Sequence, residues 1–69
     1  MAYSAHDAYN MVFTEYPDVV SITQLSQMLG ISEKTAYRLL KEKQIAHFKI
    51  GRAYRIPKLN ILDYMANIA

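Results

Sequence analysis

Residues 21–40 constrain the fold most, because they carry the pattern of two short helices separated by a tight turn. Ser21 with Gln24 three residues later is a capping box, which starts a helix. Gly30 then supplies the left-handed conformation that commonly ends a helix, and Ser32 is the N-cap of a second one. The apolar residues keep helical spacing in both segments, namely Ile22, Leu25, Met28 and Leu29 in the first and Ala36, Leu39 and Leu40 in the second. The sequence therefore predicts an αα corner.

A β-hairpin is predicted next, because the apolar period changes from helical to alternating after residue 44. Its strands fall near 47–50 and 54–56. A two-residue turn at 51–52 suits the preference of a type II′ turn for glycine in first place. A three-residue loop at 51–53 is the alternative.

The apolar pattern decides between these two registers. The two-residue turn sets Phe48 opposite Arg55, whereas the three-residue loop sets Phe48 opposite Ile56 and makes one face wholly apolar. A slip of one residue sends half of that apolar set into water, so we predict the three-residue loop. That register places Lys49 beside Arg55 on the other face, a repulsion that a bound anion would relieve.

The two ends of the chain are expected to form further helices. Pro57 suits the first turn of a last helix, whose inner stripe is Leu59, Leu62, Met65 and Ala66. Residues 1–17 are predicted as an N-terminal extension with a short helix ended by Pro17, packed on the domain or used as a dimer contact. Residues 18–69 then form the single domain that 69 residues allow.

Charge is segregated along the chain. All eight basic residues lie between positions 34 and 58. The window 31–58 contains these eight and two acidic residues, a net charge of +6, whereas the remainder has four acidic residues and no basic ones. Such segregation indicates a polyanion on one side of the molecule. Within the window, Lys43 and Lys58 are expected to be solvated surface charges, and His47 to be exposed.

Several classes of protein are not expected. The chain has no cysteine, and its two histidines lie far apart in sequence, so no metal-ligand spacing is present. Neither a glycine-rich phosphate loop nor a nucleophile elbow occurs. We expect no enzyme, no metal and no cofactor. No apolar run is long enough to cross a membrane, and we expect a cytoplasmic protein, in the bacterial nucleoid or a phage-infected cell.

A two-helix corner, a basic second helix and a basic-tipped hairpin are together the parts of a winged helix-turn-helix. The major groove of DNA admits one α-helix, whose first residues reach base edges. The residues of the second helix that lie off its buried stripe are Lys34, Thr35, Tyr37, Arg38 and Lys41. Ser32 and the first amides of this helix are suited to a phosphate oxygen. Gly51 lets the hairpin tip approach DNA closely with Arg52.

Residues 20–65 resemble the excisionase and MerR-like winged helix-turn-helix group of phage and mobile-element excisionases and small bacterial regulators. The resemblance rests on four stretches, Ile22-Thr23-Gln24-Leu25-Ser26-Gln27-Met28-Leu29-Gly30-Ile31-Ser32, Thr35-Ala36-Tyr37-Arg38-Leu39-Leu40, Ile45-Ala46-His47-Phe48-Lys49-Ile50-Gly51-Arg52 and Tyr54-Arg55-Ile56-Pro57, followed by 59–64. It implies a mostly α fold with a small hairpin.

The resemblance also implies roles for individual residues. Base contacts would come from Ser32, Lys34, Thr35 and Tyr37, a phosphate contact from Arg38, and the wing from Lys49, Arg52 and Arg55. This chain departs from the group at Glu33, a place that is often basic or small, and at Ala53, which leaves one charge at the wing tip. Glu33 would face away or accept from a cytosine amino group.

The expected partner is double-stranded DNA, bound with sequence preference by an excisionase or a transcriptional regulator. Because one small domain buries little surface on DNA, we also expect a homodimer or a cooperative assembly on DNA. An excisionase would have an integrase as partner. The alternative is a protein-interaction module that keeps the fold without binding DNA. Its support is the small total charge of +2, Glu33 in the reading helix and the aromatic N-terminal segment.

Overall fold

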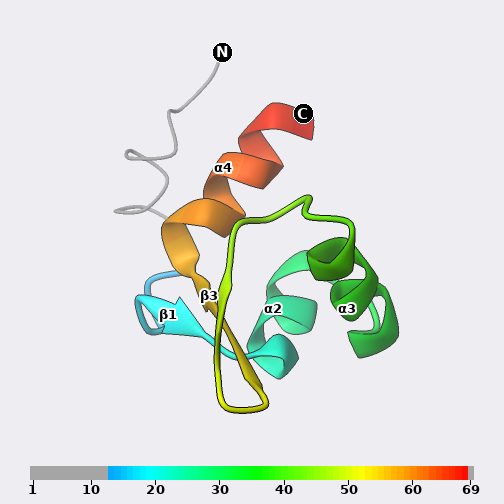
Figure 1. The fold of residues 1–69 in the computed structure, drawn as a ribbon. Coiled ribbons are helices and arrows are strands. Elements are labelled where there is room, and N and C mark those ends of the chain that lie inside the picture. Colours follow the sequence, from blue (N-terminus) through cyan, green and yellow to red (C-terminus); the bar gives the residue numbers. More distant parts are fainter. Residues whose placement is uncertain (1–12, 69) are drawn as a thin grey trace.

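The computed structural model describes residues 13–68. In chain order its elements are β1 (Val19–Val20), α2 (Ile22–Leu29), α3 (Glu33–Lys41), β2 (Phe48–Ile50), β3 (Ala53–Pro57) and α4 (Lys58–Ile68). Figure 1 shows α2 and α3 together beside the sheet, with α4 leaving the end of β3 in the direction opposite to the hairpin tip. This is the winged helix-turn-helix architecture expected from the sequence.

The helix corner forms through the local hydrogen bonds that the sequence predicted. The Gln24 N–H donates to Ser21 Oγ at 3.2 Å, and the Ser21 N–H donates to Gln24 Oε1 at 3.0 Å, which completes the capping box. The Thr35 N–H donates to Ser32 Oγ at 3.1 Å and starts α3. Both caps satisfy amides that have no partner inside their helix.

Both helices of the corner end with a residue in the left-handed region. Gly30 has φ 68° and ψ 35° after α2, as expected. Lys43 takes the same role after α3 at φ 59°, where glycine is the usual residue. The Lys43 N–H donates to the Leu40 carbonyl and the Gln44 N–H to the Leu39 carbonyl, both at 3.0 Å. These bonds pair the last carbonyls of α3 and turn the chain toward β2.

The sheet has three antiparallel strands in the order β1-β3-β2. The sequence analysis missed β1, which pairs with β3 through Val19 opposite Pro57 and Val20 opposite Ile56. Pro57 is therefore the last residue of β3, and α4 begins one residue later than expected. Because β3 has a neighbour on each side, it joins the wing to the core.

The predicted hairpin register is wrong. Phe48 lies opposite Arg55, Lys49 opposite Tyr54 and Ile50 opposite Ala53, which is the register of the two-residue turn. Gly51 has φ 61°, the positive value that the first position of a II′ turn requires. All three residues of β2 are exposed. Burial therefore does not fix this register, and the turn does.

The register places unlike residues on the two faces of the sheet, because directly opposed side chains share a face and neighbours alternate. The inner face carries Val20 and Ile56, both fully buried, and then Tyr54 and Lys49 toward the tip. The outer face carries Val19, Phe48, Ile50, Ala53, Arg55 and Pro57. Phe48 is 45% and Ile50 is 64% exposed on this outer face.

The core is formed by residues from every described helix. Its buried members are Val20, Leu25, Met28, Ala36, Leu40, Ile45, Ile56 and Ile61. The predicted inner stripe of α4 is partly wrong, because Leu59 and Ala66 are exposed and Ile61 is buried with Leu62. The stripe runs one residue earlier than expected and begins at Lys58.

Lys58 is not the solvated surface charge that the sequence predicted. It is only 4% exposed, and its Nζ donates to the carbonyls of Phe13 and Tyr16, each at 3.2 Å. Its backbone N–H also donates to the Asp18 carbonyl at 2.7 Å. One side chain thus ties the chain before β1 to the start of α4.

The predicted N-terminal helix does not extend through residues 13–17. Phe13 has φ 56°, and the Tyr16 N–H donates to its carbonyl at 3.0 Å, so this part is a turn. The two rings meet edge to face with centroids 5.8 Å apart and pack against the core. The rest of the predicted helix lies outside the described residues.

Candidate nucleic-acid interface

The exposed side of α3 and the inner face of the hairpin border one hollow of about 860 Å³. Its lining residues are Lys34, Thr35, Tyr37, Arg38, Lys41 and Tyr54. Five of these six were predicted from the sequence to face DNA. Ala36 and Leu40 turn inward from α3, which leaves Lys34, Tyr37, Arg38 and Lys41 on its exposed side.

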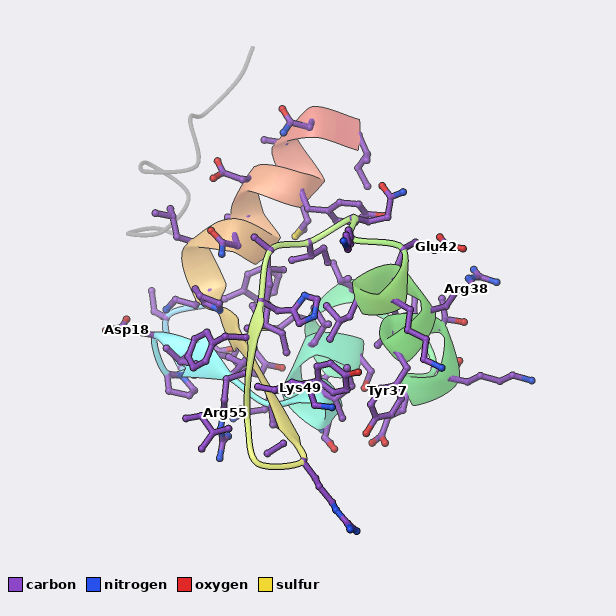
Figure 2. The ribbon with its side chains drawn as sticks, in the orientation of Figure 1. Asp18, Tyr37, Arg38, Glu42, Lys49 and Arg55 are labelled. Atoms are coloured by element: carbon purple, nitrogen blue, oxygen red, sulfur yellow. The ribbon has the colours of Figure 1, made fainter. Side chains whose placement is uncertain are left out.

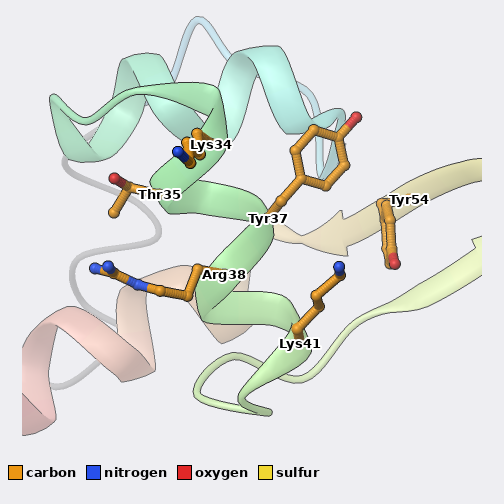
Figure 3. Close-up of a pocket in the computed structure, with 6 residues that line it drawn as sticks. All are labelled: Lys34, Thr35, Tyr37, Arg38, Lys41 and Tyr54. Atoms are coloured by element: carbon orange, nitrogen blue, oxygen red, sulfur yellow. The ribbon is translucent and has the colours of Figure 1, made fainter.

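The side chains of α3 divide into two groups around this hollow. Figure 3 shows Thr35 and Arg38 on one side of the helix, and Tyr37 and Lys41 on the side toward Tyr54. Lys34, Tyr37, Arg38 and Lys41 are exposed. The cations among them, Lys34, Arg38 and Lys41, form no ion pair with a residue in the described range 13–68, so their charges are available to an anion.

Four side chains form a cluster between α3 and the hairpin. The ring of Tyr54 meets the ring of Tyr37 edge to face, with centroids 5.6 Å apart and planes at 67°. The His47 ring lies 5.4 Å from Tyr54, and Lys49 Nζ is 4.9 Å from the Tyr54 ring centre. His47 is half-buried, so the expectation that it is exposed is wrong. Tyr54 was expected on the apolar face of the hairpin, opposite Ile50, and not among the DNA-binding residues.

The predicted wing residues do not share one face. Lys49 is on the inner face with Tyr54, Arg52 is in the exposed turn, and Arg55 is on the outer face opposite Phe48. Figure 2 shows Lys49 toward Tyr37 and Arg55 on the other side of the hairpin. The expectation that Lys49 and Arg55 lie side by side is therefore wrong, and it failed with the register.

The first turn of α3 is held by side chains of the corner. Ser32 Oγ accepts the Thr35 N–H and donates to Thr35 Oγ1, both at 3.1 Å. The Glu33 carboxylate accepts a 2.9 Å hydrogen bond from Thr23 Oγ1 in α2. Glu33 is thereby held toward α2, which agrees with the first of the two arrangements expected for it; the second, a contact with a cytosine amino group, stays a prediction.

The residues that sequence reasoning missed had weak local signals. Tyr54 reads as an apolar strand residue, and only the observed register sets it opposite Lys49. His47 was read by strand alternation, but its Nδ1 lies 2.9 Å from the Ile45 carbonyl, which turns the ring toward the cluster. For both Tyr54 and His47, the sequence pattern indicated alternation of side chains but not which face of the hairpin each one would occupy.

In residues 13–68, no three His, Cys, Asp or Glu side chains gather as a metal site would need. No helix in the same range is long and apolar enough to cross a membrane.

A capped helix corner, an exposed basic second helix and a two-stranded wing together define a winged helix-turn-helix protein. Residues 19–68 match the family model described as a helix-turn-helix domain. The chain therefore belongs to this helix-turn-helix family of DNA-binding domains. Neither the curated proteins nor the solved structures gave a match to the chain.

Proposed function

We propose that this protein binds double-stranded DNA with sequence preference, with α3 in the major groove and the hairpin as a wing. The observation that carries the proposal is the hollow where Lys34, Arg38 and Lys41 gather beside the inner face of the hairpin. Three unpaired cations on a convex helix match the negative phosphates that line both edges of a groove.

The dimensions of α3 support this placement. An α-helix with its side chains is about 10–12 Å across and the major groove is roughly 12 Å wide, so the nine residues of α3 can lie in the groove. Ser32, Lys34, Thr35 and Tyr37 belong to the first half of α3, the part that reaches base edges in such domains. Arg38 and Lys41 follow one turn later, where a phosphate lies within reach of long side chains.

The wing contributes from its inner face and its tip. Lys49 extends the cationic surface of α3 across the hollow, and Gly51 has open space around its Cα, which allows close approach of the tip to the duplex. Arg52 is exposed in that turn. Arg55 is proposed as a phosphate contact made separately, from the outer face of the wing.

We further propose that the biological role is that of an excisionase or a small transcriptional regulator of phage or mobile-element type, acting in the cytoplasm. An excisionase role brings an integrase as partner. Because a single module of this size buries only about 600–1,000 Å² on DNA, useful affinity favours a dimer or cooperative loading. Residues 3–16 are the proposed contact for a dimer that forms without DNA.

A salt titration of DNA affinity tests the proposal. With Lys34 assigned to base edges, five phosphate contacts remain, and they predict a log–log slope of about −4.5, at roughly −0.9 for each contact. Lys34→Ala is expected to change the preferred sequence, and Arg52→Ala to weaken binding to all sequences alike. Lys43→Ala is the matched control, because Lys43 is exposed but does not line the hollow. Unchanged affinity for both Arg52→Ala and Arg38→Ala would refute the interface.

A protein-interaction module is the second candidate, and the outer face of the sheet favours it. Val19, Phe48 and Ile50 are exposed there, although large apolar side chains are usually buried. An apolar protein partner would give a shallow salt slope, and Phe48→Ser would abolish its binding. A steep slope with Phe48→Ser at wild-type affinity decides for DNA.

A further inference from the structure

We propose that Tyr54 is a positioning residue, which fixes the angle of the wing to α3 so that both contact one duplex together. The ring of Tyr54 is the point where the helix, the loop before β2 and both strands of the hairpin meet. The inference rests on the proposed DNA binding for its purpose. Its first test, however, requires no DNA.

The backbone alone leaves α3 and the hairpin weakly joined. Close backbone packing joins α2 to α3, and β3 to β2, α2 and α4, whereas any packing of α3 on a hairpin strand is slighter than these. Side chains must therefore span the gap between them. Among the described residues, the ring pair Tyr37–Tyr54 does so, across the hollow that both rings line.

Tyr54 is held by three neighbours with defined geometry. Its contact with Tyr37 has the edge-to-face arrangement that aromatic rings prefer, at 5.6 Å and 67°. The His47 ring lies 5.4 Å away on a second side. Lys49 Nζ, 4.9 Å from the ring centre, adds a cation–π contact from the opposed strand. Contacts from three directions leave the ring little freedom to turn.

The cluster is anchored in the core. His47 Nδ1 makes a 2.9 Å hydrogen bond with the carbonyl of Ile45, whose side chain is buried. Two residues after Tyr54 on the same face, Ile56 is fully buried. The contacts of Tyr54 therefore fix where the distal half of the hairpin lies relative to the core.

The distal half of the hairpin lies outside the core. Every residue of β2 is exposed, and so are Gly51, Arg52 and Ala53. None of residues 48–55 is fully buried, so the Tyr54 cluster is the main described contact that resists a pivot of the hairpin about its base. The separation between Arg52 and the first turn of α3 consequently depends on this cluster.

The first test measures that separation in the free protein. The chain has no cysteine, so Lys34→Cys with Arg52→Cys gives two clean sites for nitroxide labels and pulsed EPR. We expect a narrow distance distribution, kept by Tyr54→Phe because the ring remains, and at least about twice as broad in Tyr54→Ala. Tyr64→Ala removes a half-buried ring that packs against the core away from the hollow, and should keep the narrow distribution.

A second variant keeps the inference testable if Tyr54→Ala does not fold. Tyr37 is 39% exposed, so Tyr37→Ala removes the same ring contact from the α3 side at little risk to the core. It is expected to broaden the distribution as Tyr54→Ala does. A distribution that stays narrow in folded Tyr54→Ala or Tyr37→Ala protein overturns the inference.

The second test uses DNA and a double-mutant cycle. In the wild-type background, Arg52→Ala should weaken binding by about fivefold, and in Tyr54→Ala by less than about twofold, because the wing is no longer held in place. Equal losses in both backgrounds overturn the positioning role while DNA binding stands. If the wild-type protein binds no duplex, the proposed function fails, and the EPR result still decides whether Tyr54 sets the wing.

Discussion

Thr23 in α2 donates a 2.9 Å hydrogen bond to the carboxylate of Glu33, the first residue of α3. This hydrogen bond joins α2 to α3 at the first residue of α3. The carboxylate also lies near the amides of the first turn, where a negative charge is favourable. Glu33 therefore has a local structural role that accounts for an acidic residue at the start of a basic helix.

We predict that Glu33→Gln keeps the preferred DNA sequence and binds all sequences slightly more tightly. The amide still accepts from Thr23, and the loss of one negative charge raises the net charge of the protein and its long-range attraction to DNA. Gel-shift titration over a panel of operator variants measures both effects. Thr23→Val removes the hydrogen-bond donor without a change of charge, so this variant should not bind DNA more tightly. An altered preference in Glu33→Gln would assign Glu33 to base reading instead.

We predict that Ile56→Ala costs about 2–5 kcal/mol of unfolding free energy, whereas Ile50→Ala changes it by no more than about 0.5 kcal/mol. The substitution is the same, but Ile56 is fully buried and Ile50 is 64% exposed. Urea unfolding of both variants gives the comparison. A large cost for Ile50→Ala would favour the three-residue loop, in which Ile50 belongs to the apolar face.

We predict that Lys58→Met lowers the unfolding free energy by about 1–3 kcal/mol, because two part-buried carbonyls lose their donor. Those carbonyls belong to Phe13 and Tyr16. Chemical shifts of residues 13–17 should change as well, since the ammonium is their tie to α4. Lys43→Met is the control, since Lys43 is exposed, and it should leave these shifts unchanged.

We predict that Lys43→Gly raises the unfolding free energy by roughly 0.5–1 kcal/mol, because Lys43 sits at φ 59°, where a Cβ is unfavourable. Gly30→Ala should do the opposite by about 1 kcal/mol at φ 68°, although open space surrounds the added methyl group. Thermal unfolding monitored by circular dichroism measures both shifts. Opposite signs for the pair are required if backbone conformation is the cause.

The helix corner was predictable because its signals are local. Ser21 and Gln24 cap each other within one turn, and Gly30 ends that helix by its own conformation. The hollow followed from the same signals, since the spacing of Ala36 and Leu40 decides which residues of α3 face outward. In each case the residues that determine the structure are no more than four positions apart in the sequence.

The wing and α4 were less predictable because their arrangement depends on distant parts of the chain. The hairpin pattern was interpreted as if one face were buried, but β2 extends past the core and the turn sets its register. Lys58 occupies a core position only because Phe13 and Tyr16 present carbonyls to it. The family resemblance placed the wing correctly in the chain without specifying which face Arg55 would occupy.

Most segments of a small protein must both support the core and form its surface, but β2 is exposed throughout and forms only surface. Phe48, Ile50 and Arg52 are exposed, so folding limits substitutions there little, whereas Gly51 is limited by the conformation of its turn. Tyr54 and Ile56 meanwhile keep the base of the hairpin in place. Under the proposed DNA binding, exchange of these exposed residues would change what the wing contacts while the scaffold that presents the wing stays the same.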